Sequence, residues 1–365
     1  MNELKGISLF TGAGGMDVGF VNAGVTVCIA NELDNYACDS YAENHKETKL
    51  LRGDIKHYKE EFKKNAGLDI VFGGPPCQGF SVAGKMDPYD ERSKLIWDFL
   101  DIVETVRPRV FVMENVKALG TLEKWEPIRS EFLLRSNKIG YYCNIFVLNA
   151  ADYGVSQNRE RVFFIGCQED YDPEDVLLSL KEKEQTPLPL RELLAQLPKA
   201  GTSDHPLTCT ANITLAKNPV MRKSPYAGMM FNGLGRPLNL ESVSSTLPAS
   251  MGGNKTPIID CSLLEDPSVT DWVQNYHAGL LNNEVQPAFA PAPSHLRRIT
   301  IREAALIQTF PLNYSFKGSK SSVYSQIGNA VPCKLSECVA RSTIEVCFEG
   351  KRWDNPEEGK QLCLF

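Results

Sequence analysis

Short apolar runs alternate with helical patterns over the first 167 residues of the chain. The runs predicted as strands are 6–10, 25–30, 68–74, 109–115, 143–150 and 161–166, and the helical patterns are 35–43, 92–106 and 125–138. Strands separated by helices predict βαβ units, hence an α/β fold with a mostly parallel sheet covered on both faces. Ligands of such sheets bind beyond the carboxyl ends of the strands. Residues at that edge are therefore the first candidates for function.

The pattern changes near residue 168, where a charged stretch leads into a region rich in Pro, Gly, Ser, Thr and Asn that extends to about 296. This region predicts short strands and long loops, and we interpret it as a second, smaller domain. Between 200 and 255 it carries five basic residues against two acidic ones, which a solvated loop face also explains. Further on, Thr300 and Glu303 predict a capping box, and 323–347 predicts a turn leading into an amphipathic helix.

Composition narrows the class of protein. The chain has 365 residues, of which 42% are hydrophobic, and this length suggests two or three domains. The formal net charge of −6 does not mark a nucleic-acid binder, so any such function must rest on a local patch. The sequence contains no signal-peptide pattern and no long apolar run, and we therefore expect a cytoplasmic protein without a membrane segment. The 11 cysteines form no CxxC pair, so we expect no metal site and mostly buried thiols.

A glycine-rich loop, "LFTGAGGMDVGF" at 9–20, follows the first predicted strand and opens a helix. Glycines there let the backbone approach a ligand. Glu32 ends the second strand, where a carboxylate can hold both ribose hydroxyls, and "GDI" at 53–55 lies before the next predicted strand. These features fit either a dinucleotide or S-adenosylmethionine, and a tight turn without a ligand is the simpler alternative.

The stretch "GGPPCQGFS" at 73–81 places Cys77 after two prolines, which fix the backbone and remove two amide donors. A cysteine in so rigid a loop is a candidate nucleophile, provided that nearby amides or cations lower its pKa; an inert loop cysteine is the alternative. Glu114, in "MENV", ends the next long strand at the same edge of the sheet. A buried acid there can donate a proton, whereas most such residues are merely exposed.

The motif "QNRER" alternates Gln157, Arg159 and Arg161 at the start of the last predicted strand. A side-chain period of two predicts that all three point to one face. Two guanidinium groups on one side favour an anionic partner, although a surface salt-bridge strand gives the same pattern.

Taken together and in this order, these motifs resemble those of a bacterial, single-chain DNA (cytosine-5)-methyltransferase. The resemblance covers 5–166 and about 297–347, and it includes "PPCQGFS", "ENV", "QNRER", "RRITIREAALIQTFP" and "QIGNAVP". It implies a Rossmann-like catalytic and cofactor-binding domain over 1–180, completed by about 320–348. A target-recognition domain is then expected over 181–319, followed by a tail over 349–365.

The resemblance implies covalent catalysis on a cytosine flipped out of duplex DNA within a specific sequence. Cys77 would add to C6, Glu114 would protonate N3 and hold the exocyclic amine, Arg161 would contact O2, and Arg159 would steady the loop and the glutamate. S-adenosylmethionine would donate the methyl group and leave as S-adenosylhomocysteine. The residues implied for the cofactor are Phe10, Gly12, Gly14, Glu32, Asp54, Ile55, Leu95, Asn329 and Val331. Those implied for DNA are Gln78, Ser81, Thr246, Leu247, Thr300 and Arg302.

Other readings remain open at the level of sequence. One branch of the same family acts on tRNA, a degenerate relative would bind DNA without reacting, and the glycine loop with Glu32 alone would suit a nucleotide-dependent oxidoreductase. Ser8 departs from relatives that carry an acid before "LF". The tail ends in "QLCLF", Gln361 to Phe365, which resembles the peptide that docks on the bacterial sliding clamp. A tail packed on its own domain is the alternative. We expect a nucleoid-associated monomer that needs no metal.

Overall fold

The computed structural model describes residues 3–76, 94–266 and 268–353, and these form two compact units. The first unit comprises Met1–Tyr153, Arg159–Gln185 and Val331–Phe365. The second comprises Gly154–Asn158 and Thr186–Ala330. The chain therefore leaves the first unit, builds the second, and returns to the first.

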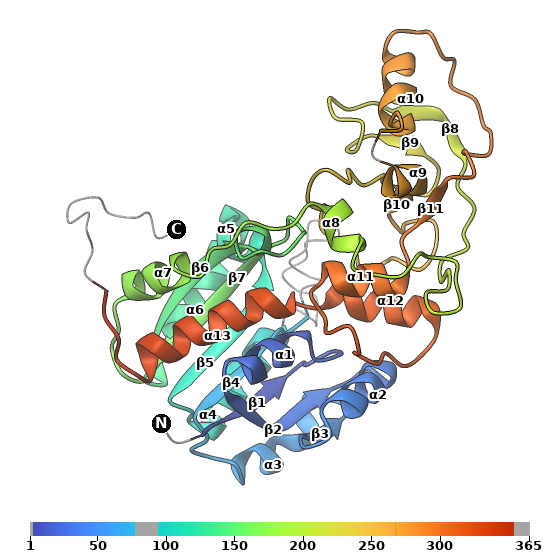
Figure 1. Ribbon diagram of the computed structural model, residues 1–365. Coiled ribbons are helices and arrows are strands. Elements are labelled where there is room, and N and C mark those ends of the chain that lie inside the picture. Colours follow the sequence, from blue (N-terminus) through green and yellow to red (C-terminus); the bar gives the residue numbers. More distant parts are fainter. Residues whose placement is uncertain (1–2, 77–93, 267, 354–365) are drawn as a thin grey trace. The chain divides into compact units, whose positions relative to one another are not determined.

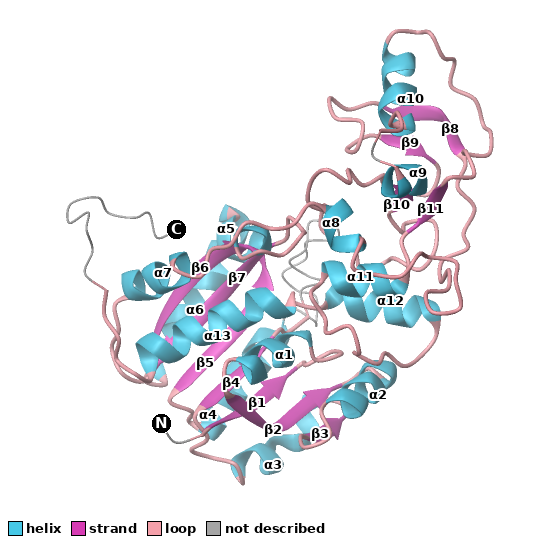
Figure 2. Ribbon diagram, viewed as in Figure 1, coloured by secondary structure: helices cyan, strands magenta, loops and turns pink. Residues whose placement is uncertain are grey.

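A seven-stranded sheet forms the centre of the first unit (Figures 1 and 2). Its strands lie in the order β3-β2-β1-β4-β5-β7-β6. All neighbours pair in parallel except β7, which runs antiparallel to both β5 and β6. The strands are β1 (Leu4–Leu9), β2 (Val25–Glu32), β3 (Lys49–Arg52), β4 (Ile70–Gly73), β5 (Val110–Val116), β6 (Tyr142–Asn149) and β7 (Glu160–Cys167). The expected α/β fold with a mostly parallel sheet is confirmed.

Helices cover both faces of this sheet, as Figure 1 shows. The helices of the unit are α1 (Gly15–Asn22), α2 (Asn35–Asn44), α3 (Lys59–Lys63), α4 (Leu95–Val106), α5 (Lys117–Thr121), α6 (Glu126–Lys138), α7 (Pro173–Lys181) and α13 (Cys333–Cys347), with short 3₁₀ turns η1 (Ile55–Tyr58), η3 (Glu123–Trp125) and η4 (Ala150–Asp152). On one face α1 packs against α13, and Phe20 of α1 stacks on Phe72 of β4 with ring centroids 3.9 Å apart.

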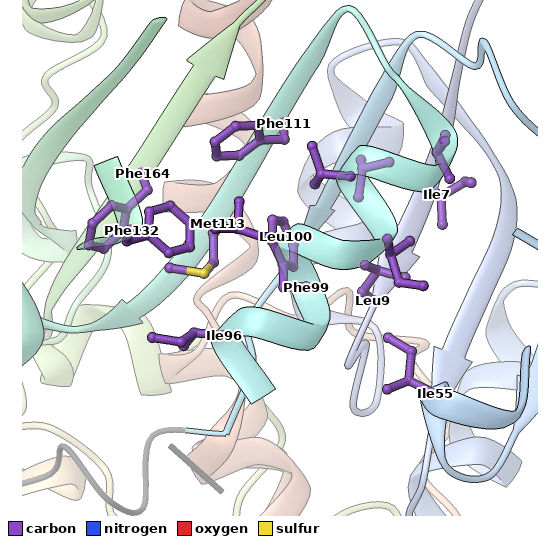
Figure 3. Close-up of a cluster of buried hydrophobic side chains, with 14 of the residues drawn as sticks. Ile7, Leu9, Ile55, Ile96, Phe99, Leu100, Phe111, Met113, Phe132 and Phe164 are labelled. Atoms are coloured by element: carbon purple, nitrogen blue, oxygen red, sulfur yellow. The ribbon is translucent and has the colours of Figure 1, made fainter. Parts of the chain in front are cut away.

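The main hydrophobic core lies on the opposite face of the sheet (Figure 3). Helix α4 buries residues at helical spacing, among them Ile96, Phe99 and Leu100, and a single apolar stripe of this kind holds a helix on a sheet. The sheet and α6 contribute Ile7, Leu9, Phe111, Met113, Phe132 and Phe164 to the same cluster. This core anchors β1, β4 and β5, whose carboxyl ends carry the candidate site.

The second unit contains short elements joined by long loops, as its composition predicts. Its elements are α8 (Leu190–Leu194), β8 (Leu215–Val220), β9 (Met229–Phe231), β10 (Ile258–Asp260), α9 (Cys261–Glu265), α10 (Trp272–Leu281), β11 (Leu296–Arg298), α11 (Ile301–Ile307) and α12 (Lys320–Asn329). The strands form two-stranded antiparallel pairs, β8 with β9 and β10 with β11. The predicted turn at the start of 323–347 is wrong, because 323–329 continues α12.

Candidate active site

The predicted functional segments of the first unit meet at one edge of the sheet. Strands β1 to β5 run in parallel, so their carboxyl ends lie at the same edge. Strands β1 and β4 are neighbours in the middle of the sheet. From β1 the chain continues to β2 and β3 on one side, and from β4 it continues to β5 on the other side. Such a reversal of strand order opens a crevice where α/β sheets bind ligands. The glycine loop and Glu32 lie on one side of the reversal, and "GGPP" and Glu114 lie on the other.

The glycine loop takes backbone conformations that few residues adopt. Phe10, Gly12 and Gly14 have φ values of 54°, 57° and 87°. A Cβ on Gly12 would meet no atom within 4 Å, so glycine is required there by its backbone angle and not by crowding. Gly14 is the N-cap of α1. The loop therefore turns sharply from β1 into a helix whose N-terminal amides point beyond the sheet edge.

Glu32, the last residue of β2, is held by three backbone amides. Its Oε2 accepts a hydrogen bond from Gly12 N at 2.7 Å, and its Oε1 accepts from Leu33 N and Asp34 N, both at 2.8 Å. Burial raises the pKa of Glu32, while these amides oppose the shift by stabilising the anion. A carboxylate has about four acceptor positions, so this one keeps capacity for a further donor such as a ribose hydroxyl.

The "GDI" segment follows a strand that the sequence analysis missed. The sequence placed this segment before the next predicted strand, whereas in the structure it directly follows β3. It therefore lies at the carboxyl end of β3, at the same edge as the other segments. Asp54 is exposed and caps η1 by accepting from Lys56 N at 3.0 Å, whereas Ile55 is buried in the core. Leu95 is half-buried where α4 begins.

The two cofactor residues expected near the C-terminus fall in different units. Asn329 is exposed at the end of α12 in the second unit, and Val331 is buried in the first. Their roles stay predictions.

Glu114 and Arg161 form a shielded ion pair between β5 and β7. Arg161 Nε lies 2.8 Å from Glu114 Oε1, and the two side chains are only 14% and 11% exposed. Burial raises the pKa of Glu114, and the positive charges of Arg161 and Arg159 oppose the shift without cancelling it. A carboxyl group in this state can carry a proton nearer to neutral pH than an exposed glutamate can.

Gly74, the residue that follows β4, leaves room for that carboxylate. A Cβ on Gly74 would lie 2.7 Å from Glu114 Oε2, so the carboxylate would have to shift to make room for it. The loop after β4 is also tied to β5, because Asn115 Nδ2 donates to Pro75 O at 3.2 Å while Asn115 Oδ1 accepts from Val116 N. Asn115 was not among the predicted site residues, although it stands inside the "ENV" motif.

Cys77, Gln78 and Ser81 lie outside the described residues, as does the tail from 354 onward. The structure describes the loop up to Pro76, which immediately precedes the expected nucleophile.

The prediction that Gln157, Arg159 and Arg161 share one face of a strand is wrong, because only Arg161 lies in β7 and both Gln157 and Arg159 precede it. Strand β7 begins only at Glu160, and Gln157 belongs to the second unit. There its amide donates to Gln308 Oε1 at 2.9 Å and accepts from Leu247 N at 2.8 Å. Arg159 is buried and its charge acts on Glu114, as that of Arg161 does.

The residues expected to contact DNA from the second unit have mainly internal contacts. Leu247 is buried, and Thr246 Oγ1 donates to Asn158 O at 2.7 Å. Thr300 caps α11 in the predicted capping box with Glu303, and its hydroxyl also bonds His205 Nε2 at 2.6 Å. Arg302 is partly exposed and donates to the backbone carbonyl of Asp204. Contacts of these residues with DNA stay predictions.

Within 3–76, 94–266 and 268–353, no group of three or more His, Cys, Asp or Glu side chains is arranged to hold a metal ion. No helix in that part of the chain is long and apolar enough to cross a membrane.

Comparison with known proteins assigns a family. The model of the family described as C-5 cytosine-specific DNA methylase matches residues 4–345. Type II methyltransferase M.FnuDI of Fusobacterium nucleatum is 31% identical, covering 99% of this chain and 100% of that protein. M.NgoPII of Neisseria gonorrhoeae is also 31% identical, covering 94% and 97% of the two chains.

Solved structures agree in fold. A putative DNA modification methyltransferase encoded within an Escherichia coli prophage has a TM-score of 0.64 at 22% identity, covering 93% of this chain and 98% of that one. The Dnmt2 methyltransferase of S. pombe has a TM-score of 0.64 at 17% identity, covering 95% and 99%. At these identities the likeness concerns the fold alone, whereas the family match extends over nearly the whole sequence. The chain belongs to the C-5 cytosine-specific DNA methylase family.

Proposed function

We propose that the protein transfers a methyl group from S-adenosylmethionine to C5 of a flipped-out cytosine within a specific duplex DNA sequence, through a covalent bond between Cys77 and C6. The observation that supports this most is the shielded Glu114–Arg161 pair at the end of β5, beside the rigid loop that leads to Cys77. A proton donor held by a fixed cation suits a reaction in which negative charge builds on a heterocycle.

The cofactor side of the site fits S-adenosylmethionine. This molecule supplies an electrophilic methyl group on a sulfonium. Phe10, Gly12 and Gly14 would line the turn beside it, and Glu32 would accept from its ribose. Asp54, Ile55 and Leu95 would contact the adenine end, with Asn329 and Val331 completing the set. The remaining acceptor capacity of Glu32 and the open space above Gly12 support this choice.

On the base, the reaction needs electrons at a carbon that is a poor nucleophile. The Cys77 thiolate forms a bond to C6, Glu114 gives a proton to N3, and C5 thereby acquires enamine character. C5 then takes the methyl group. Loss of the C5 proton to solvent, return of the N3 proton to Glu114 and breaking of the bond from sulfur to C6 then restore the neutral ring, the carboxylic acid and the thiolate. Arg161 Nε holds the carboxyl in place through its 2.8 Å contact, and Nη1 donates to Glu160 O at 2.8 Å, so Nη2 is the donor that would face the base O2.

The alternatives differ in substrate or in class. A tRNA substrate would keep the same chemistry, but the second unit, built over Thr186–Ala330, supports a reader of duplex base edges. A non-catalytic DNA-binding relative would have no use for a carboxyl whose pKa is raised beside two arginines, so the pair at Glu114 counts against that reading.

The proposal is tested with the purified full chain and plasmid DNA. Bisulfite sequencing after incubation with S-adenosylmethionine should show 5-methylcytosine at one recurring sequence. Cys77→Ala should abolish methylation and leave cofactor binding intact, while Cys28→Ala, at a half-buried cysteine of β2, should behave as the wild type. Normal turnover by Cys77→Ala would refute the assignment of the nucleophile. Methylation of tRNA with no product in DNA would select the alternative substrate.

The C-terminal tail carries a separate proposal. Gln361–Phe365 would dock as an extended peptide on the bacterial sliding clamp, which would place the enzyme on newly replicated DNA within the nucleoid. The last described residues are tethered to α7, because Trp353 N donates to Asp175 Oδ1 at 2.8 Å and Arg352 faces the same carboxylate.

A further inference from the structure

A buried carboxylate lies beneath the glycine loop and takes no part in the proposed chemistry. Asp17, in the first turn of α1, is fully buried. It accepts hydrogen bonds from three hydroxyl groups: Ser8 Oγ at 3.0 Å, Tyr41 OH at 2.9 Å, and Thr11 Oγ1. A buried carboxyl group is costly unless its oxygens are hydrogen-bonded, and here β1, the glycine loop and α2 each supply a donor.

Thr11 connects this carboxylate to the loop. Its own polar groups are all engaged: Oγ1 donates to Asp17, N donates to Asn31 O at 3.1 Å, and O accepts from Gly14 N at 2.9 Å. Thr11 is buried and stands between Phe10 and Gly12, both of which have positive φ. Three hydrogen bonds of Thr11 therefore fix the middle of the loop, between two residues with unusual backbone angles.

Hydrogen bonds of Asn31 extend this network to the two other segments proposed to bind the cofactor, those of Glu32 and of "GDI". Asn31 is 2% exposed, and its Nδ2 donates to Leu51 O at 2.9 Å and to Gly53 O at 3.0 Å. Asn31 directly precedes Glu32, and Gly53 directly precedes Asp54. A continuous path of hydrogen bonds thus runs from Asp17 through Thr11 and the Asn31 backbone to the turn after β3.

We infer that Asp17 and the Thr11 hydroxyl are positioning residues for the methyl donor: they set the glycine loop, and through it the alignment of Glu32 and the "GDI" turn. The inference rests on the proposed cofactor site. Both side chains are buried and hydrogen-bonded to each other, so their effect on the cofactor would be indirect. They fix beforehand the backbone that would contact it, which lowers the ordering cost of binding.

Removing one hydroxyl tests this. Thr11→Val keeps the size and branching of the side chain and deletes the donor to Asp17, while Thr11→Ser restores it. The dissociation constant of S-adenosylmethionine is measured by calorimetry on the full chain, alongside DNA affinity and kcat at saturating cofactor. Thr11→Val should weaken cofactor binding about tenfold. DNA affinity and kcat should change less than about twofold, because the cofactor, once bound, has the same position in the variant as in the wild type. Thr11→Ser should bind the cofactor as the wild type does.

Two further variants keep the test decisive. Tyr41→Phe removes a different donor to the same carboxylate and should also weaken cofactor binding. Thr343→Val, at a buried threonine of α13 in the same unit, should not. Wild-type affinity for S-adenosylmethionine in folded Thr11→Val or Tyr41→Phe would overturn the inference. The inference would also be overturned if these variants lost affinity for DNA by the same factor as affinity for S-adenosylmethionine and had a lowered melting temperature, because the effect would then be a general loss of structure. If the wild type itself binds no S-adenosylmethionine, the proposed function fails first.

Discussion

Glu114→Gln is the substitution that most sharply separates proton donation from architecture. The amide has nearly the shape of the carboxyl, and its oxygen can still accept the 2.8 Å hydrogen bond from Arg161 Nε. Its nitrogen cannot supply the proton that N3 requires. Removal of a general acid typically lowers kcat by about 10²- to 10⁴-fold, and we expect a loss in that range.

The stability cost should be small because two terms oppose each other. Replacing a charge-assisted hydrogen bond by a neutral one loses roughly 1 kcal/mol. In return, the variant no longer buries the carboxylate charge, and that burial is the main cause of the raised pKa of Glu114. We therefore expect a net change in the free energy of unfolding of no more than about 1 kcal/mol.

Single-turnover methylation of a short duplex measures the chemical step directly, with cofactor and DNA affinities measured in parallel. Glu160→Gln is the matched control. Glu160 precedes Arg161 in β7, but its side chain pairs with Lys117 at the surface and is 48% exposed. That variant should keep the wild-type rate. If Glu114→Gln retained more than about a tenth of the wild-type rate, Glu114 would not be the proton donor.

Three further predictions concern Gly74, the pH dependence of the methylation rate and the C-terminal tail. Gly74→Ala should lower kcat with little change in cofactor affinity, since its Cβ would displace the Glu114 carboxylate; wild-type kcat would contradict this. The methylation rate should fall as pH rises through the raised pKa of Glu114, because the proton to be donated is then lost, and a profile that rises monotonically to high pH would count against the assignment. Deleting 361–365 should abolish capture by immobilised sliding clamp without affecting methylation of a short duplex, whereas retained capture would exclude the tail as the docking peptide.

The sequence predicted the parts of the fold that have a strong apolar pattern. Six of the strands in the main sheet are buried enough to stand out, but β3 was missed, because this edge strand of four residues has only one buried position, Leu51. That omission misplaced "GDI" relative to its strand. Periodicity also could not show where β7 begins, so Gln157 was assigned to a face that it does not share.

The sequence predicts the residues of the candidate site only where a recognisable motif lies at the carboxyl end of a predicted strand. Glu32 and Glu114 stand at carboxyl ends of strands, where position alone marks them. Asp17 carries no such mark, because an acid in the first turn of a helix usually interacts with the helix dipole at the surface. Its partners come from positions 8, 11 and 41, and only tertiary packing brings them together.

The covalent adduct of Cys77 with C6 of cytosine is the central claim, and trapping it is the most direct test. A duplex carrying 5-fluorocytosine at the target position should react once with the full chain and S-adenosylmethionine and then stay attached, since fluorine cannot leave C5 as a proton does. Tryptic digestion should yield the modified peptide 65–85, in which Cys77 is the only cysteine. An adduct on any other residue, or methylation of ordinary DNA by a protein that forms no adduct, would contradict the account.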